Sequence, residues 1–74
     1  MTHVPLLAHV ALIEDQPEKG LTRGQLGTVV EYLGAPSDPA LLVEFSSESG
    51  EAYAFAELKP SQLIVLHRRH TDAA

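Results

Sequence analysis

Short β-prone segments separated by turn-forming residues limit the folds open to this 74-residue chain. Runs of β-branched and other apolar residues alternate with glycine, proline and acidic pairs, which favour turns and loops. The runs that predict strands are residues 9–13, 25–33, 41–47, 52–58 and 63–67. Five short strands at close spacing predict an all-β domain.

We expect these strands to form a small five-stranded SH3-like barrel, because closing the sheet hides its edges and gives one core. Residues 16–24 predict a long polar first loop in which Leu21 anchors to the core. Residues 34–40 contain one glycine and two prolines and predict a second loop. Residues 59–63 suit one short 3₁₀ turn before the last strand.

The alanine-rich run at residues 52–58 would also suit a helix. The Ser49-Gly50 turn before it and Lys59-Pro60 after it favour a strand. Alternation places Val43 and Phe45 in the core, and we expect Phe55 there as well. We expect Tyr32 and Tyr53 to be half exposed.

Four glycines are predicted to shape the turns. Gly24 ends the first loop, Gly34 begins the second and Gly50 forms a hairpin turn. Gly27 precedes β-branched residues, which indicates a bulge or the close approach of another backbone.

The domain is predicted to span residues 9–67, with an N-terminal extension at 1–8 and a polar tail at 68–74. Val4, Leu6 and Leu7 in the extension are expected to be exposed, and suggest either a docking segment or a dimer contact. A homo-oligomer is therefore left open, as a source of stability for so small a core.

Ten acidic residues against five basic ones give a net charge of −5. Domains that bind phosphate backbones usually present a basic face, so nucleic acid is not the expected partner. The cluster His67-Arg68-Arg69-His70 is interpreted as a solubilising tail. The apolar N-terminal stretch lacks the features of a signal peptide, no run has the length of a membrane helix, and the chain has no cysteine. We expect a cytoplasmic protein without membrane contact.

The residues that carry chemistry form no recognisable catalytic pattern. His67 and His70 have no third metal ligand at close spacing, and the serines lack a nucleophile elbow. A barrel of this size is expected to leave little room for a pocket of a few hundred cubic ångströms. We therefore predict no catalytic residue, no metal, no cofactor and no enzymatic activity.

Three stretches, ALIEDQPEKGLTRGQLGTVVEYL, VEFSSESGEAYAFAEL and KPSQLIVL, together resemble a family of small uncharacterised bacterial proteins, a domain of unknown function. The resemblance covers about residues 9–66. It implies an SH3-like fold and, weakly, a setting in toxin–antitoxin or immunity-like gene pairs. It supplies no catalytic residue.

The stretch RGQLGTVVEYLG is also similar to the KOW motif of some ribosomal proteins and elongation factors. Those RNA-binding motifs carry lysine and arginine around the glycines. Here the same stretch contains Arg23 as its one basic residue, together with the acidic Glu31.

Two functions from different classes follow. The first is a non-catalytic protein-interaction module, an antitoxin-like, immunity-like or accessory partner of a co-expressed protein. Its predicted contact residues are Glu14, Asp15, Glu18, Tyr32 and Tyr53. The alternative is a KOW-like accessory protein of nucleic acid or the ribosome.

Overall fold

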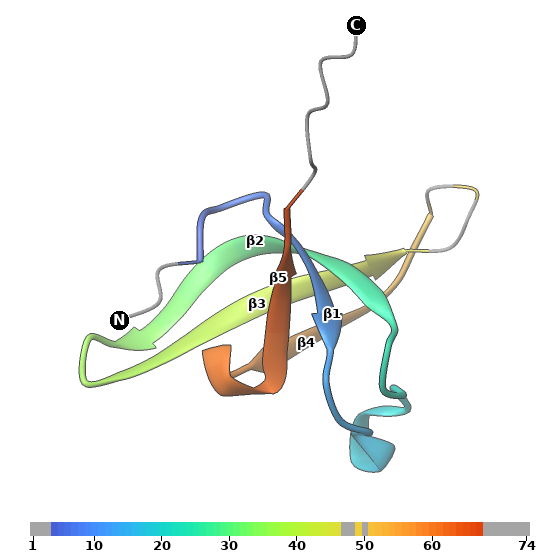
Figure 1. Ribbon diagram of the computed structural model, residues 1–74, viewed down its shortest axis with the longest axis horizontal. Helices are drawn as coiled ribbons and strands as arrows, with labels where there is room; N and C mark the ends of the chain where they lie inside the picture. The colour runs from blue at the N-terminus through green and yellow to red at the C-terminus, as the bar shows by residue number, and fades with distance from the viewer. Residues whose placement is uncertain (1–3, 47–48, 50, 68–74) are drawn as a thin grey trace, which may run out of the picture.

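The fold is one antiparallel sheet of five strands in the order β4-β3-β2-β1-β5 (Figure 1). This computed structural model describes residues 4–46, 49 and 51–67. The strands are β1 (His9–Leu12), β2 (Leu26–Ala35), β3 (Asp38–Ser46), β4 (Ala52–Leu58) and β5 (Leu63–Leu66). Single 3₁₀ turns, η1 (Pro17–Lys19) and η2 (Pro60–Gln62), precede β2 and β5. The predicted all-β fold and the 3₁₀ turn before the last strand are confirmed, whereas η1 is an addition to the predicted first loop.

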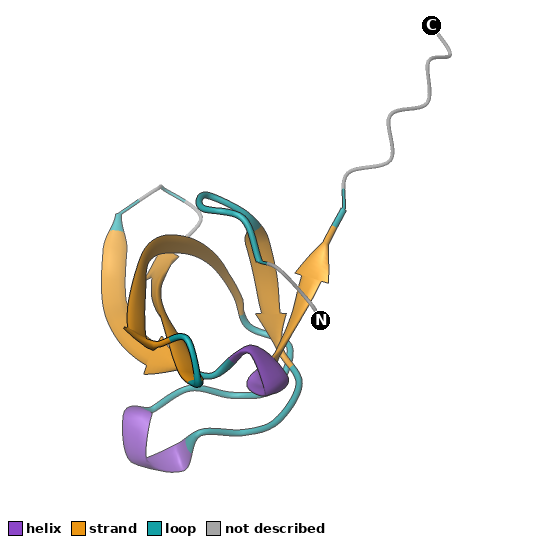
Figure 2. Ribbon diagram, turned by 90° about the vertical axis from the view of Figure 1, so that its left-hand side faces the viewer, coloured by secondary structure: helices purple, strands orange, loops and turns teal. Residues whose placement is uncertain are grey.

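The sheet is strongly curled, as the end-on view in Figure 2 shows. Strand β1 lies between β2 and β5, so residues from the two ends of the domain pair with each other. Within the described part of the chain, no ladder joins β4 to β5. The SH3-like barrel is therefore compact but not closed, and β4 and β5 are edge strands.

The core lies inside this curled sheet. It contains Val43 and Phe45, both fully buried as predicted, and the loop residue Leu21 packs against them in the same cluster. The buried members of the cluster are Val4, Val10, Leu12, Leu21, Val29, Leu41, Val43, Phe45, Ala56, Leu58 and Leu63.

Phe55 corrects the predicted core, because it is 59% exposed. The register pairs Phe45 with Ala54 and Glu44 with Phe55, so β4 turns Ala54 and Ala56 inward and its aromatic residues outward. The ring of Phe45 already fills the space inside. Small neighbours beside a large ring allow dense packing without strain.

Gly27 provides the second small neighbour. A Cβ atom at this position would lie 2.6 Å from Val43 Cγ1 and 3.0 Å from Phe45 Cε1. The predicted close approach at Gly27 is thus confirmed, and its cause is the inner face of β3. The predicted Gly24 turn has a left-handed φ of 89°, and Gly50 lies outside the described residues.

The loop predicted at residues 34–40 is wrong. Strand β2 continues to Ala35 and β3 begins at Asp38, with these two residues paired, so only Pro36 and Ser37 form the reversal. Gly34, with a φ of 78°, lies inside β2 and faces Pro39 across the ladder. The turn-forming residues here make a tight two-residue hairpin turn instead of a longer loop.

The segment before β1 is packed against the domain. Val4 is buried in the core, contrary to the expected exposure, whereas Leu6 and Leu7 are exposed as expected. The N–H of Leu7 donates to the carbonyl of Val29 at 2.7 Å. The predicted tail at 68–74, including Arg68, Arg69 and His70, lies outside the described residues.

Candidate protein-binding groove

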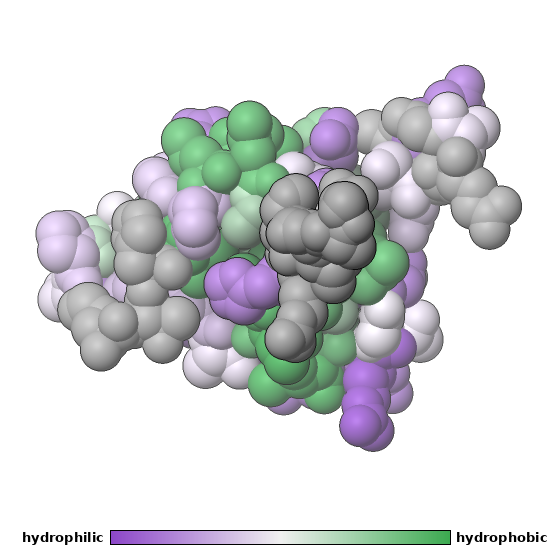
Figure 3. Space-filling view, turned by 45° about the horizontal axis from the view of Figure 1, so that its top comes forward, coloured by the Kyte–Doolittle hydropathy of each residue, from purple (hydrophilic) through white to green (hydrophobic). Residues whose placement is uncertain are grey.

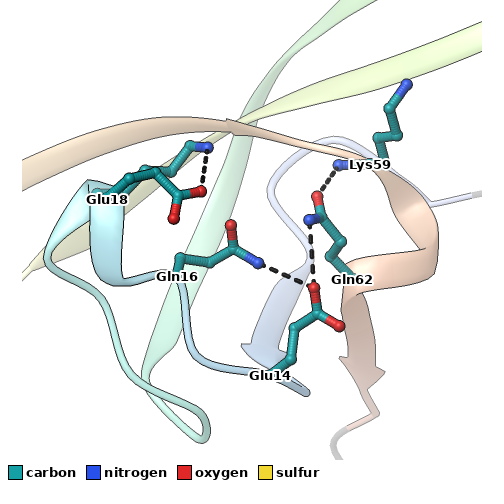
Figure 4. Close-up of polar contacts among 6 residues, drawn as sticks. Glu14, Gln16, Glu18, Lys59 and Gln62 are labelled. Carbon is teal, nitrogen blue, oxygen red and sulfur yellow. Dashed lines mark hydrogen bonds and ion pairs between the residues drawn. The ribbon is translucent and has the colours of Figure 1, made fainter.

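Carboxylates of the acidic first loop accept hydrogen bonds from other residues of the loop and from η2. Oε2 of Glu14 accepts hydrogen bonds from Nε2 of Gln16 at 3.1 Å and of Gln62 at 3.5 Å (Figure 4). Gln16 is only 4% exposed, and its backbone pairs with Leu21 on the other side of the loop. Glu14 therefore joins the loop to η2 and satisfies a buried amide.

Asp15 and Glu18 also make contacts within the loop. Oδ1 of Asp15 accepts the backbone N–H of Arg23 at 2.8 Å. Glu18 lies 3.7 Å from the ammonium group of Lys19. Each acidic residue of the predicted binding set thus has a structural role in the loop.

The two predicted tyrosines lie in different places, and both are about half exposed as predicted. The hydroxyl of Tyr53 accepts a hydrogen bond from Nε2 of Gln25 at 2.6 Å, which places Tyr53 at the end of the first loop. The hydroxyl of Tyr32 donates to the carbonyl of Val4 at 2.7 Å. The structure therefore associates Tyr53 with the loop and puts Tyr32 in another site.

Tyr32 belongs to an open apolar groove of about 1050 Å³. Most of its lining residues belong to the end of the β2–β3 hairpin near Pro36 and to η2 and β5. Figure 1 draws the backbone of the hairpin in green and that of η2 and β5 in orange to red. Of the described residues that line it, none is charged. They are Val4, Tyr32, Leu33, Gly34, Ala35, Pro36, Pro39, Ala40, Leu41, Pro60, Ser61, Leu63, Ile64 and Val65.

This groove corrects the expectation that so small a barrel leaves little room for a pocket of a few hundred cubic ångströms. It exists because the sheet does not close, so the hairpin and β5 remain apart. Its lining comes from four separated parts of the chain, and no local sequence pattern marks it. The prolines of the hairpin tip by themselves predict a loop and give no indication of a groove.

A smaller polar cavity of about 430 Å³ lies behind the hairpin tip. Lys59 and Asp38 face each other there, with Nζ and Oδ1 2.6 Å apart. This ion pair joins the start of η2 to the hairpin, and each of its residues is followed in the chain by a proline that lines the groove.

Further large apolar side chains are exposed on the convex face of the sheet. Cross-strand pairing places Leu26, Ala11 and Ile64 in one row, and Thr28, His9 and Leu66 in the next. Phe55 lies across from Glu44 on the same face. Figure 3 shows hydrophobic surface in separate clusters, with hydrophilic side chains between them. Such scattered exposure is common on soluble proteins.

Neither metal ligands nor a membrane span stands out in the part of the chain that the structure describes. There, no three residues among histidine, cysteine, aspartate and glutamate are placed to hold a metal ion together. The helical elements there are too short to cross a membrane.

Comparison with known proteins gives one family. Neither the curated proteins nor the solved structures yield a match. The model of one protein family matches residues 6–65, which include β1 to β4, both 3₁₀ turns, β5 except Leu66 and the groove lining except Val4. The chain therefore belongs to the family described as a domain of unknown function (DUF4926).

Proposed function

We propose that this domain is a non-catalytic protein-interaction module that binds an apolar segment of a protein partner in the groove. The observation that carries this proposal is the uncharged lining of the groove. One fifth of all residues in the chain are charged, yet none of the described lining residues is. A charge buried in an apolar contact would be costly. Covering this surface with a partner buries no charge from the groove lining.

Tyr32 supports the same function. Its ring lines the groove and is half exposed, while its hydroxyl is held by Val4. A tyrosine with a fixed hydroxyl offers a large apolar contact and loses little conformational entropy on binding. Proline residues at the rim, Pro36, Pro39 and Pro60, likewise restrict the backbone around it.

The first loop is proposed as a flanking contact for a basic part of the partner. Glu14, Asp15 and Glu18 are exposed, and a carboxylate that accepts one or two hydrogen bonds keeps further acceptor sites. Tyr53 adds an aromatic surface at the end of this loop. This contact would mainly affect the association rate and its salt dependence.

Nucleic acid is the weaker alternative. Lys19 and Lys59 each pair with a carboxylate, and the chain as a whole is acidic. An antitoxin-like or immunity-like role for the module follows from the family resemblance and is part of the proposal. The absence of cysteine is compatible with the reducing cytoplasm, which is the compartment we propose.

The test compares two arginine substitutions at exposed serines. Ser61→Arg places bulk and charge in the groove, and Ser46→Arg places the same side chain at the end of β3, away from the groove. Each tagged variant captures partners from lysate of the natural host, once without and once with nuclease treatment. We expect one stoichiometric protein with the wild type and Ser46→Arg, and its loss with Ser61→Arg. Equal capture by all three proteins would contradict a function of the groove, and RNA lost on nuclease treatment would favour the alternative.

A further inference from the structure

The edge of β5 that faces away from β1 borders the groove. Three consecutive residues of β5, namely Leu63, Ile64 and Val65, line it. Because successive strand residues point to opposite faces of a sheet, a groove lined by three in a row follows the edge of the strand. In the described part of the chain, β5 pairs with β1 and with no other strand.

The register shows which backbone groups of β5 point into the groove. The N–H of Ile13 donates to the carbonyl of Gln62 at 3.1 Å, which fixes the phase of the antiparallel ladder. By alternation, the backbone of Ile64 and Leu66 bonds to β1, and that of Leu63 and Val65 points away from it. The N–H of Leu63 is used by the carbonyl of Pro60 in η2. Val65 therefore presents both an N–H donor and a carbonyl acceptor to the groove.

We propose that the partner binds as an extended segment that adds a strand to β5, with Val65 at the centre of the new ladder. This inference rests on the proposed function of the groove and names its binding mode. The paired part of the segment is about as long as β5, which has four residues. Every second side chain of the segment would point toward Val4, Leu41 and Leu63, so these positions take uncharged aliphatic or β-branched residues.

The chemistry of the groove selects this occupant over a second copy of the chain. A protein segment supplies backbone hydrogen bonds to Val65 and apolar side chains to the lining at the same time. Two copies joined through β5 would bring together two chains that each carry a net charge of −5. Association of like-charged proteins is slowed and weakened at low salt.

The experiment starts from a displayed library of random peptides selected on the immobilised wild-type protein. Enriched peptides are synthesised with capped termini and titrated against Val65→Pro and Val65→Ala. Proline removes the N–H of residue 65 but no bond to β1, and proline is tolerated on edge strands. Alanine keeps the N–H and removes only the side-chain methyl groups. Thermal unfolding of both variants checks that they are folded.

We expect uncharged peptides with alternating β-branched residues. Their affinity should fall about tenfold or more with Val65→Pro and about threefold or less with Val65→Ala. The reason is that a lost backbone hydrogen bond costs more binding free energy than a small lost apolar contact. Amide hydrogen exchange on the wild type gives a second readout that needs no variant. The N–H of Val65 should become protected when the peptide binds, while that of Ser46 stays unchanged.

Peptides that bind the wild type and a folded Val65→Pro equally, without protection of the Val65 amide, would overturn strand addition. If Ser61→Arg still abolishes their binding, the groove function stands and only the mode fails. If Ser61→Arg has no effect either, both fail. A wild-type dimer that Val65→Pro separates, seen by sedimentation, would assign the edge to a second copy instead.

Discussion

The acidic first loop and the uncharged groove differ in how fully their groups are used inside the fold. In the loop, Glu14, Asp15 and Glu18 each have a partner within the chain. In the groove, the backbone of Val65 points outward and the apolar lining faces open space. The loop is conspicuous in the sequence because of its charge, whereas the groove becomes visible only when the strands are assembled.

This difference teaches that conspicuous charge is a poor guide to a binding site in so small a domain. A domain of this size buries little apolar surface, so its polar side chains are needed to organise long connections. A strand edge that no neighbouring strand covers, next to exposed apolar side chains, is a better indicator of a partner. We expect changes in the loop to affect mainly stability and the association rate, and changes at the groove to affect the affinity for a partner.

The largest effect is expected at Leu21. Its side chain is buried in the core and anchors the whole first loop, so Leu21→Ala should lower the free energy of unfolding by about 2–5 kcal/mol. Leu26→Ala is the matched control, because Leu26 is exposed and should change stability by less than about 0.5 kcal/mol. Urea unfolding measures both. Similar small losses for the two variants would show that the loop is not part of the cooperative fold.

A smaller effect is expected at Glu14. Glu14→Ala removes the acceptor for the buried amide of Gln16, and leaving such a donor unsatisfied should cost about 1–2 kcal/mol. Glu18→Ala removes an exposed ion pair with Lys19 and should cost less than about 0.5 kcal/mol. Thermal unfolding of the two variants tests the ranking. The reverse order would mean that the carboxylate of Glu14 does not stabilise the first loop.

The smallest effect is expected for the ion pair between Lys59 and Asp38, which joins η2 to the β2–β3 hairpin. Both side chains of Lys59 and Asp38 are more than half exposed, so a double-mutant cycle with alanine should give a coupling energy of about 0.2–1 kcal/mol. The coupling should shrink further in high salt. A larger, salt-independent coupling would mean that the walls of the groove are rigidly joined, which would oppose the insertion of a strand.

Local sequence pattern was sufficient to predict the five strands and the turn before β5. β-Branched runs and turn residues act over a few positions, and these elements depend on little else. The predicted Leu21 anchor also follows from a local contrast, one large apolar residue within a polar loop.

The face of β4 could not be predicted in this way. Alternation shows that Tyr53 and Phe55 share a face, but not whether that face is the inner one. The choice depends on Phe45 and Gly27, which lie on other strands and already fill the space. The groove could not be predicted for the same reason, because the hairpin and β5 are far apart in the sequence and lie on either side of the groove only in the folded domain.

The pairing of β1 with β5 has a consequence for the synthesis of the protein. Ala11 pairs with Ile64, so β1, which is made before the other strands, has no partner on one side until nearly the whole domain has been made. Contacts between residues so distant in sequence form slowly and late. A growing chain that has not reached β5 therefore exposes the apolar residues of β1 to other unfinished chains. The ribosome must release almost the entire domain before all five strands can pair.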